Sequence, residues 1–210
     1  MNQILLSLGN KSRQGKDEAV AGIKDWCSRN NFPVLHVNFA DALKIEVTEA
    51  IREAGSPDVL IAQMNMPSWV RPTPNADTEP LSPHGKHPKI LQWWGGDYRR
   101  SQNPKYWVDK RREKIVDFDG IVITSDQRYI NEAIDTLELG GHNVNVRRLD
   151  ENGKQYIDPS RPANHLSEIE LDDWNWDFRI ISGPGQQRLV KMQAVQILKY
   201  ILFKEDGVIG

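Results

Sequence analysis

Residues 3–20 read QILLSLGNKSRQGKDEAV, and this stretch decides the fold. The apolar run at 4–8 predicts a buried strand that ends at Gly9, and a helix is expected to begin near Lys16. A strand, a glycine turn, a lysine and a helix in this order are typical of a phosphate-binding loop. In such a loop the backbone N–H groups converge on one anion, which the helix dipole also stabilises.

The residues around Gly15 modify this pattern in two ways. The standard motif has one residue fewer between its two glycines than the segment from Gly9 to Gly15. Asp17 stands where the motif has a serine or threonine that binds Mg²⁺, and a carboxylate is also a suitable oxygen ligand. Lys16 is expected to reach the β- and γ-phosphates, although the pattern alone leaves open an ordinary strand–turn–helix.

Composition limits the class of protein. The 210 residues are enough for one hydrophobic core with a small additional lobe. The net charge of −2 argues against a nucleic-acid polymer as partner, and the single cysteine excludes an intrachain disulfide. No apolar run is long enough to span a bilayer, and no secretory signal is evident. We therefore expect a cytoplasmic protein, in the host cytoplasm if a phage encodes it, with no membrane partner.

Strands and helices are predicted to alternate along most of the chain. The expected strands are 4–8, 33–39, 118–124, 143–148 and 177–182. The expected helices are 17–30, 41–54, 129–139 and 186–203. This alternation predicts an α/β fold with a mainly parallel five-stranded sheet and helices on both faces, in one domain that spans 1–210.

Two segments interrupt the alternation. Residues 57–112 are the expected substrate-binding lobe, and the polar residues 149–168 are an expected lid-like loop. Most of the chain's twelve prolines lie in the first part of the lobe, so 58–88 is expected to be irregular. The second part is expected to contain a helix from Lys89, a break at Gly95-Gly96, and another helix from about Asn103 or Pro104.

Six short motifs follow one another in a fixed order. They are Gly15-Lys16-Asp17, Phe39-Ala40-Asp41-Ala42-Leu43-Lys44, Leu91-Gln92-Trp93-Trp94-Gly95-Gly96-Asp97, Tyr106-Trp107, Asp126-Gln127-Arg128 with Asn131-Glu132, and His165-Leu166-Ser167-Glu168. Together they resemble the deoxynucleoside monophosphate kinase family of tailed bacteriophages, over nearly the whole chain except 58–88. The resemblance implies a P-loop kinase fold and transfer of the γ-phosphoryl group of ATP to a deoxynucleoside monophosphate, with Mg²⁺.

The chain departs from the family pattern at three places. Glu18 stands where the family loop has a threonine. Gly95-Gly96-Asp97 stands where the family often has Gly-Thr-Asp, so Gly96 replaces a threonine. Ser182-Gly183 replaces an Asn-Gly turn after the last strand. These departures bear on base preference and rate more than on fold.

The expected nucleotide site combines the loop with residues after the third strand. ATP is expected to contact Gly9, Ser12, Arg13, Gln14, Gly15, Lys16, Asp17, Glu18, Arg147 and Arg148. Lys16, Asp126 and Arg128 are the expected catalytic residues, and Mg²⁺ is expected between Asp17 and Asp126. Asp126 ends a buried strand, which is where open α/β sheets place ligand-binding groups. Arg128 has the planar fork that suits phosphate, with an ion pair to Glu132 as the alternative.

The acceptor nucleotide is expected to bind mainly through the lobe. The expected contacts are Lys44, Gln92, Gly95, Gly96, Asp97, Arg99, Arg100, Trp107, Asp126, Arg128 and Glu132. Trp107 is a candidate to stack on the base, whereas Trp93 is expected in the core of the lobe. The motif that contains His165, Ser167 and Glu168 is interpreted as a loop anchor or a cap, with Glu168 as a candidate to cap a helix start.

Two alternative functions remain open from the sequence. One is a related small-molecule kinase, such as an enzyme that acts on dephospho-coenzyme A. The other is a P-loop protein that binds nucleotide without turnover, which the altered loop leaves open. Small-molecule nucleotides are the expected partners in each case, and a homodimer is an open alternative for the quaternary structure.

Overall fold

The computed structural model describes residues 3–70, 87–159 and 166–205 of the chain. The chain divides into two compact units. Unit 1 comprises Met1–Asn38 and Arg112–Gly210, and unit 2 comprises Phe39–Arg111. Each unit has hydrophobic clusters of its own, so the two are described separately.

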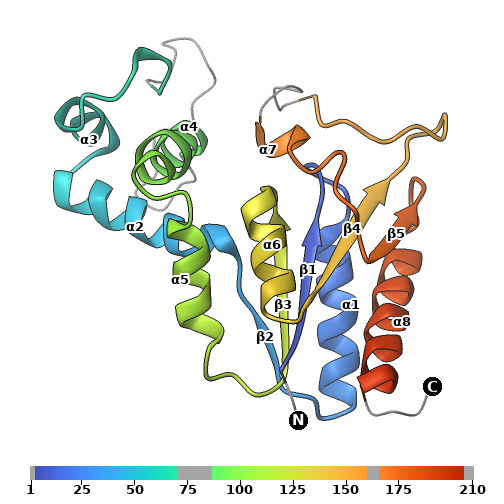
Figure 1. Cartoon of the computed structure of the whole chain (residues 1–210). Helices are drawn as coiled ribbons and strands as arrows, with labels where there is room; N and C mark the ends of the chain where they lie inside the picture. Colours follow the sequence, from blue (N-terminus) through green and yellow to red (C-terminus); the bar gives the residue numbers. More distant parts are fainter. Residues whose placement is uncertain (1–2, 71–86, 160–165, 206–210) are drawn as a thin grey trace. The chain divides into compact units, whose positions relative to one another are not determined.

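Unit 1 is built on a five-stranded sheet in which every neighbouring pair of strands is parallel. The strands are β1 (Ile4–Gly9), β2 (Val34–His36), β3 (Ile121–Gln127), β4 (His142–Arg148) and β5 (Phe178–Ser182). Their order across the sheet is β2-β3-β1-β4-β5, with β1 in the centre (Figure 1). The predicted α/β fold with a parallel five-stranded sheet is confirmed.

Helices cover both faces of this sheet, which explains why β1 is buried along its whole length. On one face α1 (Lys16–Arg29) and α8 (Gln187–Glu205) lie side by side (Figure 1) and share a core with alternate strand residues such as Leu6 and Ile123. On the other face lies α6 (Ile130–Glu138), where the Ser7 and Thr136 hydroxyls hydrogen bond at 2.7 Å.

The carboxyl end of β1 is a topological switch point. After β1 the chain passes through α1 to β2 on one side, whereas β4 flanks β1 on the other side. Ligands of open α/β sheets bind in the crevice at such a point. The loop between Gly9 and Lys16 is therefore at the position where this architecture favours a ligand.

All regular elements in the described residues of unit 2 are helices, joined by short turns. It contains α2 (Phe39–Ala54), α3 (Pro57–Gln63), the 3₁₀ turn η1 (Ser68–Val70), α4 (Pro88–Gln92), the π-helix η2 (Trp93–Arg100) and most of α5 (Tyr106–Ile115). Its core joins aliphatic residues of α2 and α3 to Trp94 and Trp107. Because α2 belongs to this core, the unit begins at Phe39 and not at the predicted residue 57.

Two predictions for unit 2 are wrong. The segment 58–88 was expected to be irregular, but α3 begins at Pro57, and the Ser56 hydroxyl caps it by accepting from the Val59 N–H at 3.2 Å. Residues 71–86 of that segment lie outside the described residues. The expected break at Gly95-Gly96 is also absent from the described backbone, because η2 runs through both glycines.

Residue 95 is a glycine because the Leu43 side chain lies close to its Cα, although the helix η2 continues through this position. A Cβ at Gly95 would lie 2.8 Å from a methyl carbon of Leu43. The Gly95 carbonyl also accepts a hydrogen bond from the Trp107 indole at 2.9 Å. The glycine therefore serves packing within unit 2, which a pattern of turn residues does not reveal.

Boundaries in unit 1 shift by a few residues. β2 is shorter than predicted, and β3 extends to Gln127, so Asp126 lies within the last part of that strand. The expected lid, 149–168, contains one isolated antiparallel bridge between Leu149 and Gln155 and the short helix α7 (Leu166–Ile169). Its residues 160–165 are not among those described. None of the helices in the described part of the chain is long and apolar enough to cross a membrane.

The contact between α1 and α8 gives a test of the fold. A Cβ at Gly22 would lie 2.8–2.9 Å from backbone and Cβ atoms of Lys191. We predict that Gly22→Ala lowers the free energy of unfolding by about 1–3 kcal/mol through overpacking, although alanine has the higher helix propensity. Urea unfolding measures this. Ser28→Ala, at an exposed position of the same helix, is the control and should change stability by under about 0.5 kcal/mol. A Gly22→Ala protein as stable as wild type would contradict the packing.

Candidate functional site

The loop from Gly9 to Lys16 has an unusual backbone. Gly15, which precedes the first residue of α1, has φ +97°. Asn10 and Arg13 also have positive φ, at +105° and +53°, although neither is glycine. Such backbones persist only where neighbouring groups hold them in place, and they cluster at ligand sites.

Two amide side chains hold the loop. Gln14 is buried, and its Nε2 donates to the carbonyls of Ser12 at 3.0 Å and Tyr156 at 2.8 Å. Its Oε1 accepts from the backbone N–H of Arg148 at 2.9 Å. Asn10 Nδ2 donates to Asn145 Oδ1 at 2.7 Å. The loop is thereby fixed to the end of β4 and to the segment that follows it.

Lys16 folds back over this loop. Its Nζ donates to the carbonyl oxygens of Lys11 at 2.6 Å and Asn10 at 3.2 Å. The residue is only 8 % exposed, although a lysine is normally among the most exposed residues. An ammonium held at the centre of a loop by backbone carbonyls can exchange those carbonyls for phosphate oxygens.

Several charges act on the same ammonium. The pKa of Lys16 is lowered to about 7, first by burial and second by the positive charge of Arg128. The negative charges of Glu168, Asp126 and Asp17 oppose this shift. Arg128, Asp126 and Asp17, which the sequence analysis assigned to the nucleotide site, thus lie near enough to Lys16 to act on its charge.

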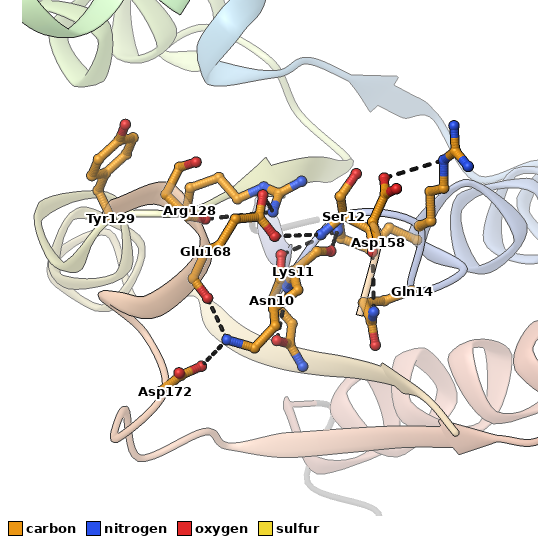
Figure 2. A network of polar contacts seen from close by, with 12 residues as sticks. Asn10, Lys11, Ser12, Gln14, Arg128, Tyr129, Asp158, Glu168 and Asp172 are labelled. Atoms are coloured by element: carbon orange, nitrogen blue, oxygen red, sulfur yellow. Dashed lines mark hydrogen bonds and ion pairs between the residues drawn. The ribbon is translucent and has the colours of Figure 1, made fainter. Parts of the chain in front are cut away.

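Arg128 forms an ion pair with Glu168, a partner that the sequence did not indicate. Its Nη1 donates to Glu168 Oε1 at 3.0 Å, and Oε2 of the same carboxylate accepts from the Ser12 N–H at 3.0 Å (Figure 2). Glu132 Oε2 instead accepts from the backbone N–H groups of Arg128 and Tyr129, at 2.7 and 3.2 Å. Glu132 therefore caps the start of α6 with its carboxylate.

Glu168 lies inside α7 (Leu166–Ile169), and its carboxylate accepts from the Ser12 N–H of the loop. Of the two roles expected from the sequence, this contact agrees with a loop anchor rather than with a cap at a helix start. Lys11 joins the same segments, because its Nζ donates to the Glu168 carbonyl and to Asp172 Oδ1, the latter at 2.6 Å. The only signal in the sequence was the motif at 165–168, whose His165 lies outside the described residues.

Further basic residues surround the loop. Arg13 pairs with Asp158, which is almost fully buried, at 3.2 Å. The Arg148 guanidinium lies over the Tyr156 ring, 4.6 Å from its centroid, while Arg147 is exposed. These arginines lie in unit 1 together with Ser12 and Gln14. The residues expected to contact ATP therefore all belong to the same unit.

The carboxylates fit Mg²⁺ in kind. Proteins usually hold this ion through one or two carboxylates, with the other positions filled by phosphate oxygens and water. Asp17 is exposed in the first turn of α1, and Asp126 is half-buried at the end of β3. Within residues 3–70, 87–159 and 166–205, no three His, Cys, Asp or Glu side chains gather as a preformed cage. Asp17 and Asp126 are the residues that would hold the ion beside a bound phosphate.

The predicted acceptor residues of unit 2 have varied surroundings. Gln92 and Asp97 are exposed, and Lys44 forms an exposed pair with Asp41 at 3.0 Å. Gly95 and Gly96 lie in η2, as do Arg99 and Arg100.

Arg99 and Trp107 are occupied within unit 2. Arg99 donates to Glu46, and its guanidinium lies 4.9 and 5.1 Å from the ring centroids of Tyr106 and Tyr98. Trp107 is 2 % exposed in the core of the unit. The expectation that Trp107 stacks on a base is therefore not supported by its position, whereas Trp93, half-buried against Tyr98, packs as predicted.

Comparisons with known proteins give no further assignment. No protein-family model matches the chain, and no curated protein matches it either. The site is therefore interpreted from its own residues and geometry.

The low pKa of Lys16 predicts how stability depends on pH. Because its pKa is about 7 in the folded protein and 10.5 ordinarily, the unfolded chain binds one more proton between these values. The contribution of Lys16 to folding therefore becomes more favourable as pH rises from 7, by up to about 1.4 kcal/mol per pH unit. Urea unfolding at pH 7, 8 and 9 should show the stability of wild type rising relative to Lys16→Met. Lys24→Met, at an exposed position of α1, is the control and should give a constant difference. A constant difference for Lys16→Met as well would contradict the lowered pKa of Lys16 in the folded protein.

Proposed function

We propose that the protein transfers the γ-phosphoryl group of ATP to a deoxynucleoside monophosphate, on a P-loop kinase fold. The observation that carries this proposal is the buried ammonium of Lys16 at the junction of the loop and α1, surrounded by Arg128, Asp126 and Asp17. The position of the loop at the carboxyl end of the central strand supports it. The resemblance of the motifs to the phage kinase family selects the nucleotide substrate.

The residues of unit 1 can supply what phosphoryl transfer needs. An oxygen of the acceptor phosphate attacks the γ-phosphorus, the bond to the β–γ bridging oxygen breaks, and ADP leaves with that electron pair. The reaction needs alignment and neutralisation of charge more than covalent chemistry. Lys16 and the loop N–H groups hold the β- and γ-phosphates, and Arg128 holds the acceptor phosphate. Mg²⁺, held by Asp17 and Asp126, would supply further positive charge when bound.

The proposed roles of the other segments follow from their position in the chain. Arg147 and Arg148 stand at the end of β4, next to the segment 149–168 that is proposed as a lid. Exposed polar residues of unit 2, such as Gln92 and Asp97, are proposed to read the base and sugar.

A second candidate is a P-loop protein that binds nucleotide without turnover. The contact between Glu168 and the Ser12 N–H favours it, because a carboxylate already occupies a donor that would face phosphate. A coupled assay that offers ATP, Mg²⁺ and each of the four deoxynucleoside monophosphates separates the two functions. ADP formed only when an acceptor is present supports the kinase, whereas nucleotide binding without ADP formation supports the second candidate.

Lys16→Ala tests the assignment of the loop. Loss of a charged contact that strengthens in the transition state should lower kcat/KM by about 10²–10³. Lys24→Ala removes the same kind of side chain from an exposed position of α1 and should keep wild-type kinetics. A folded Lys16→Ala protein with near-normal kcat/KM would rule out the proposed site.

Arg128→Lys tests the acceptor role. Lysine keeps the charge but loses the fork that can bind two phosphate oxygens at once, so the KM for the monophosphate should rise about tenfold or more while that for ATP changes little. Arg188→Lys, at an exposed position of α8, is the control. Steady-state kinetics with each substrate varied in turn measures both constants. Equal small changes in the two KM values would remove Arg128 from the acceptor site.

A further inference from the structure

The Glu168 carboxylate is held as a phosphate group would be. One oxygen accepts from the backbone N–H of Ser12 and the other from the guanidinium of Arg128, both at 3.0 Å (Figure 2). The Glu168 side chain is only 6 % exposed. Loop N–H groups and arginine forks are the donors that proteins use for phosphate oxygens. Two donors of an anion subsite are thus present, and their acceptor is part of the same chain.

The position of this carboxylate is specific. Ser12 belongs to the loop assigned to ATP, whereas Arg128 is assigned to the acceptor phosphate. A single group that touches both lies between the donor and the acceptor, where the transferred phosphoryl group must pass. We propose that Ser12 N–H and Arg128 form one subsite for the transferred phosphoryl group, and that Glu168 occupies this subsite until a polyphosphate displaces it. The inference rests on the proposed function.

Displacement follows from electrostatics. A phosphate at this subsite would lie within hydrogen-bonding distance of the same two donors, so it would meet the Glu168 carboxylate at close range. Like charges in a largely buried site repel strongly because solvent screens them poorly. Both anions therefore do not occupy the subsite together, and Glu168 must move outward when a phosphate enters.

The segment that carries Glu168 is suited to such a movement. The apolar side chains of α7 are exposed, Leu166 by 58 % and Ile169 by 40 %, so little apolar packing holds the helix. Its contacts with the loop are polar, through Glu168 and Lys11. Leu171, which follows, is buried against Ala133 and Trp176 and can serve as the fixed end.

Binding of inorganic tripolyphosphate, which lacks base and sugar, tests the proposal. If Glu168 fills the subsite in nine-tenths or more of the molecules, its removal should raise the apparent affinity about tenfold or more. Isothermal titration of the full chain should therefore show a Kd for Glu168→Gln at least about tenfold below that of wild type. Unchanged or weaker binding by Glu168→Gln would overturn the proposal.

Glu170→Gln is the matched control. It changes the charge of the same segment by the same amount, but the Glu170 carboxylate accepts from the Ile130 N–H at the start of α6, at 3.0 Å. We expect its Kd to equal that of wild type. An equal gain in both variants would show a general effect of net charge and would overturn the assignment to Glu168.

Hydrogen exchange of the wild-type protein gives a second measurement, which does not depend on the folding of a variant. Tripolyphosphate should slow amide exchange in residues 10–16 and accelerate it in 166–172. Slower exchange in both segments would show that Glu168 stays docked beside the ligand, and the proposal would fail.

The failures of the two proposals can be told apart. If neither wild type nor Glu168→Gln binds tripolyphosphate, the anion loop is wrong, and the proposed function fails together with this inference. If both bind it equally and wild type phosphorylates a deoxynucleoside monophosphate, only the role of Glu168 fails.

Discussion

The burial of the Lys16 ammonium is the constraint around which the polar groups of unit 1 are arranged. Taking an ammonium out of water is unfavourable unless other groups replace its hydration. Here two loop carbonyls accept from it, and three carboxylates lie near enough to favour its charge. Its pKa nevertheless stays low, so these groups compensate only in part. Burial of this ammonium lowers the stability of the folded chain, and the proposed phosphate binding is a task that a desolvated cation serves.

The framework of the site could be predicted from sequence because local patterns determine it. The continuous apolar runs around Leu6 and Ile123 reflect strands covered on both faces, and turn residues mark where these strands end. Parallel strands place their carboxyl ends at one edge, so the position of Asp126 near Lys16 follows from the fold class. The segment between β1 and α1 was located for the same reason, since a strand, a turn and a helix that follow one another are contiguous in the sequence.

What could not be predicted depends on contacts between distant residues. No local pattern shows that the Glu168 carboxylate returns to Ser12, or that Gln14 bonds the backbone of Arg148. The start of the segment 58–88 was misread because proline at the first position of a helix looks the same as proline in a loop, and only the Ser56 cap distinguishes them. The glycine at 95 was misread because its role is set by Leu43, in another helix.

The charges around the loop explain why an internal carboxylate is needed at all. The positive charge of Arg128 acts on Lys16 and lowers its pKa, so the two cations oppose each other in a largely buried place. The Glu168 carboxylate acts in the opposite direction on Lys16, and it accepts from both Arg128 and the Ser12 N–H. In the proposed function, a residue that stabilises the loop in this way also competes with phosphate for the same donors. Stability of the loop and affinity for the proposed phosphate are therefore opposed at this position, and the balance between them would set how readily the phosphate displaces Glu168.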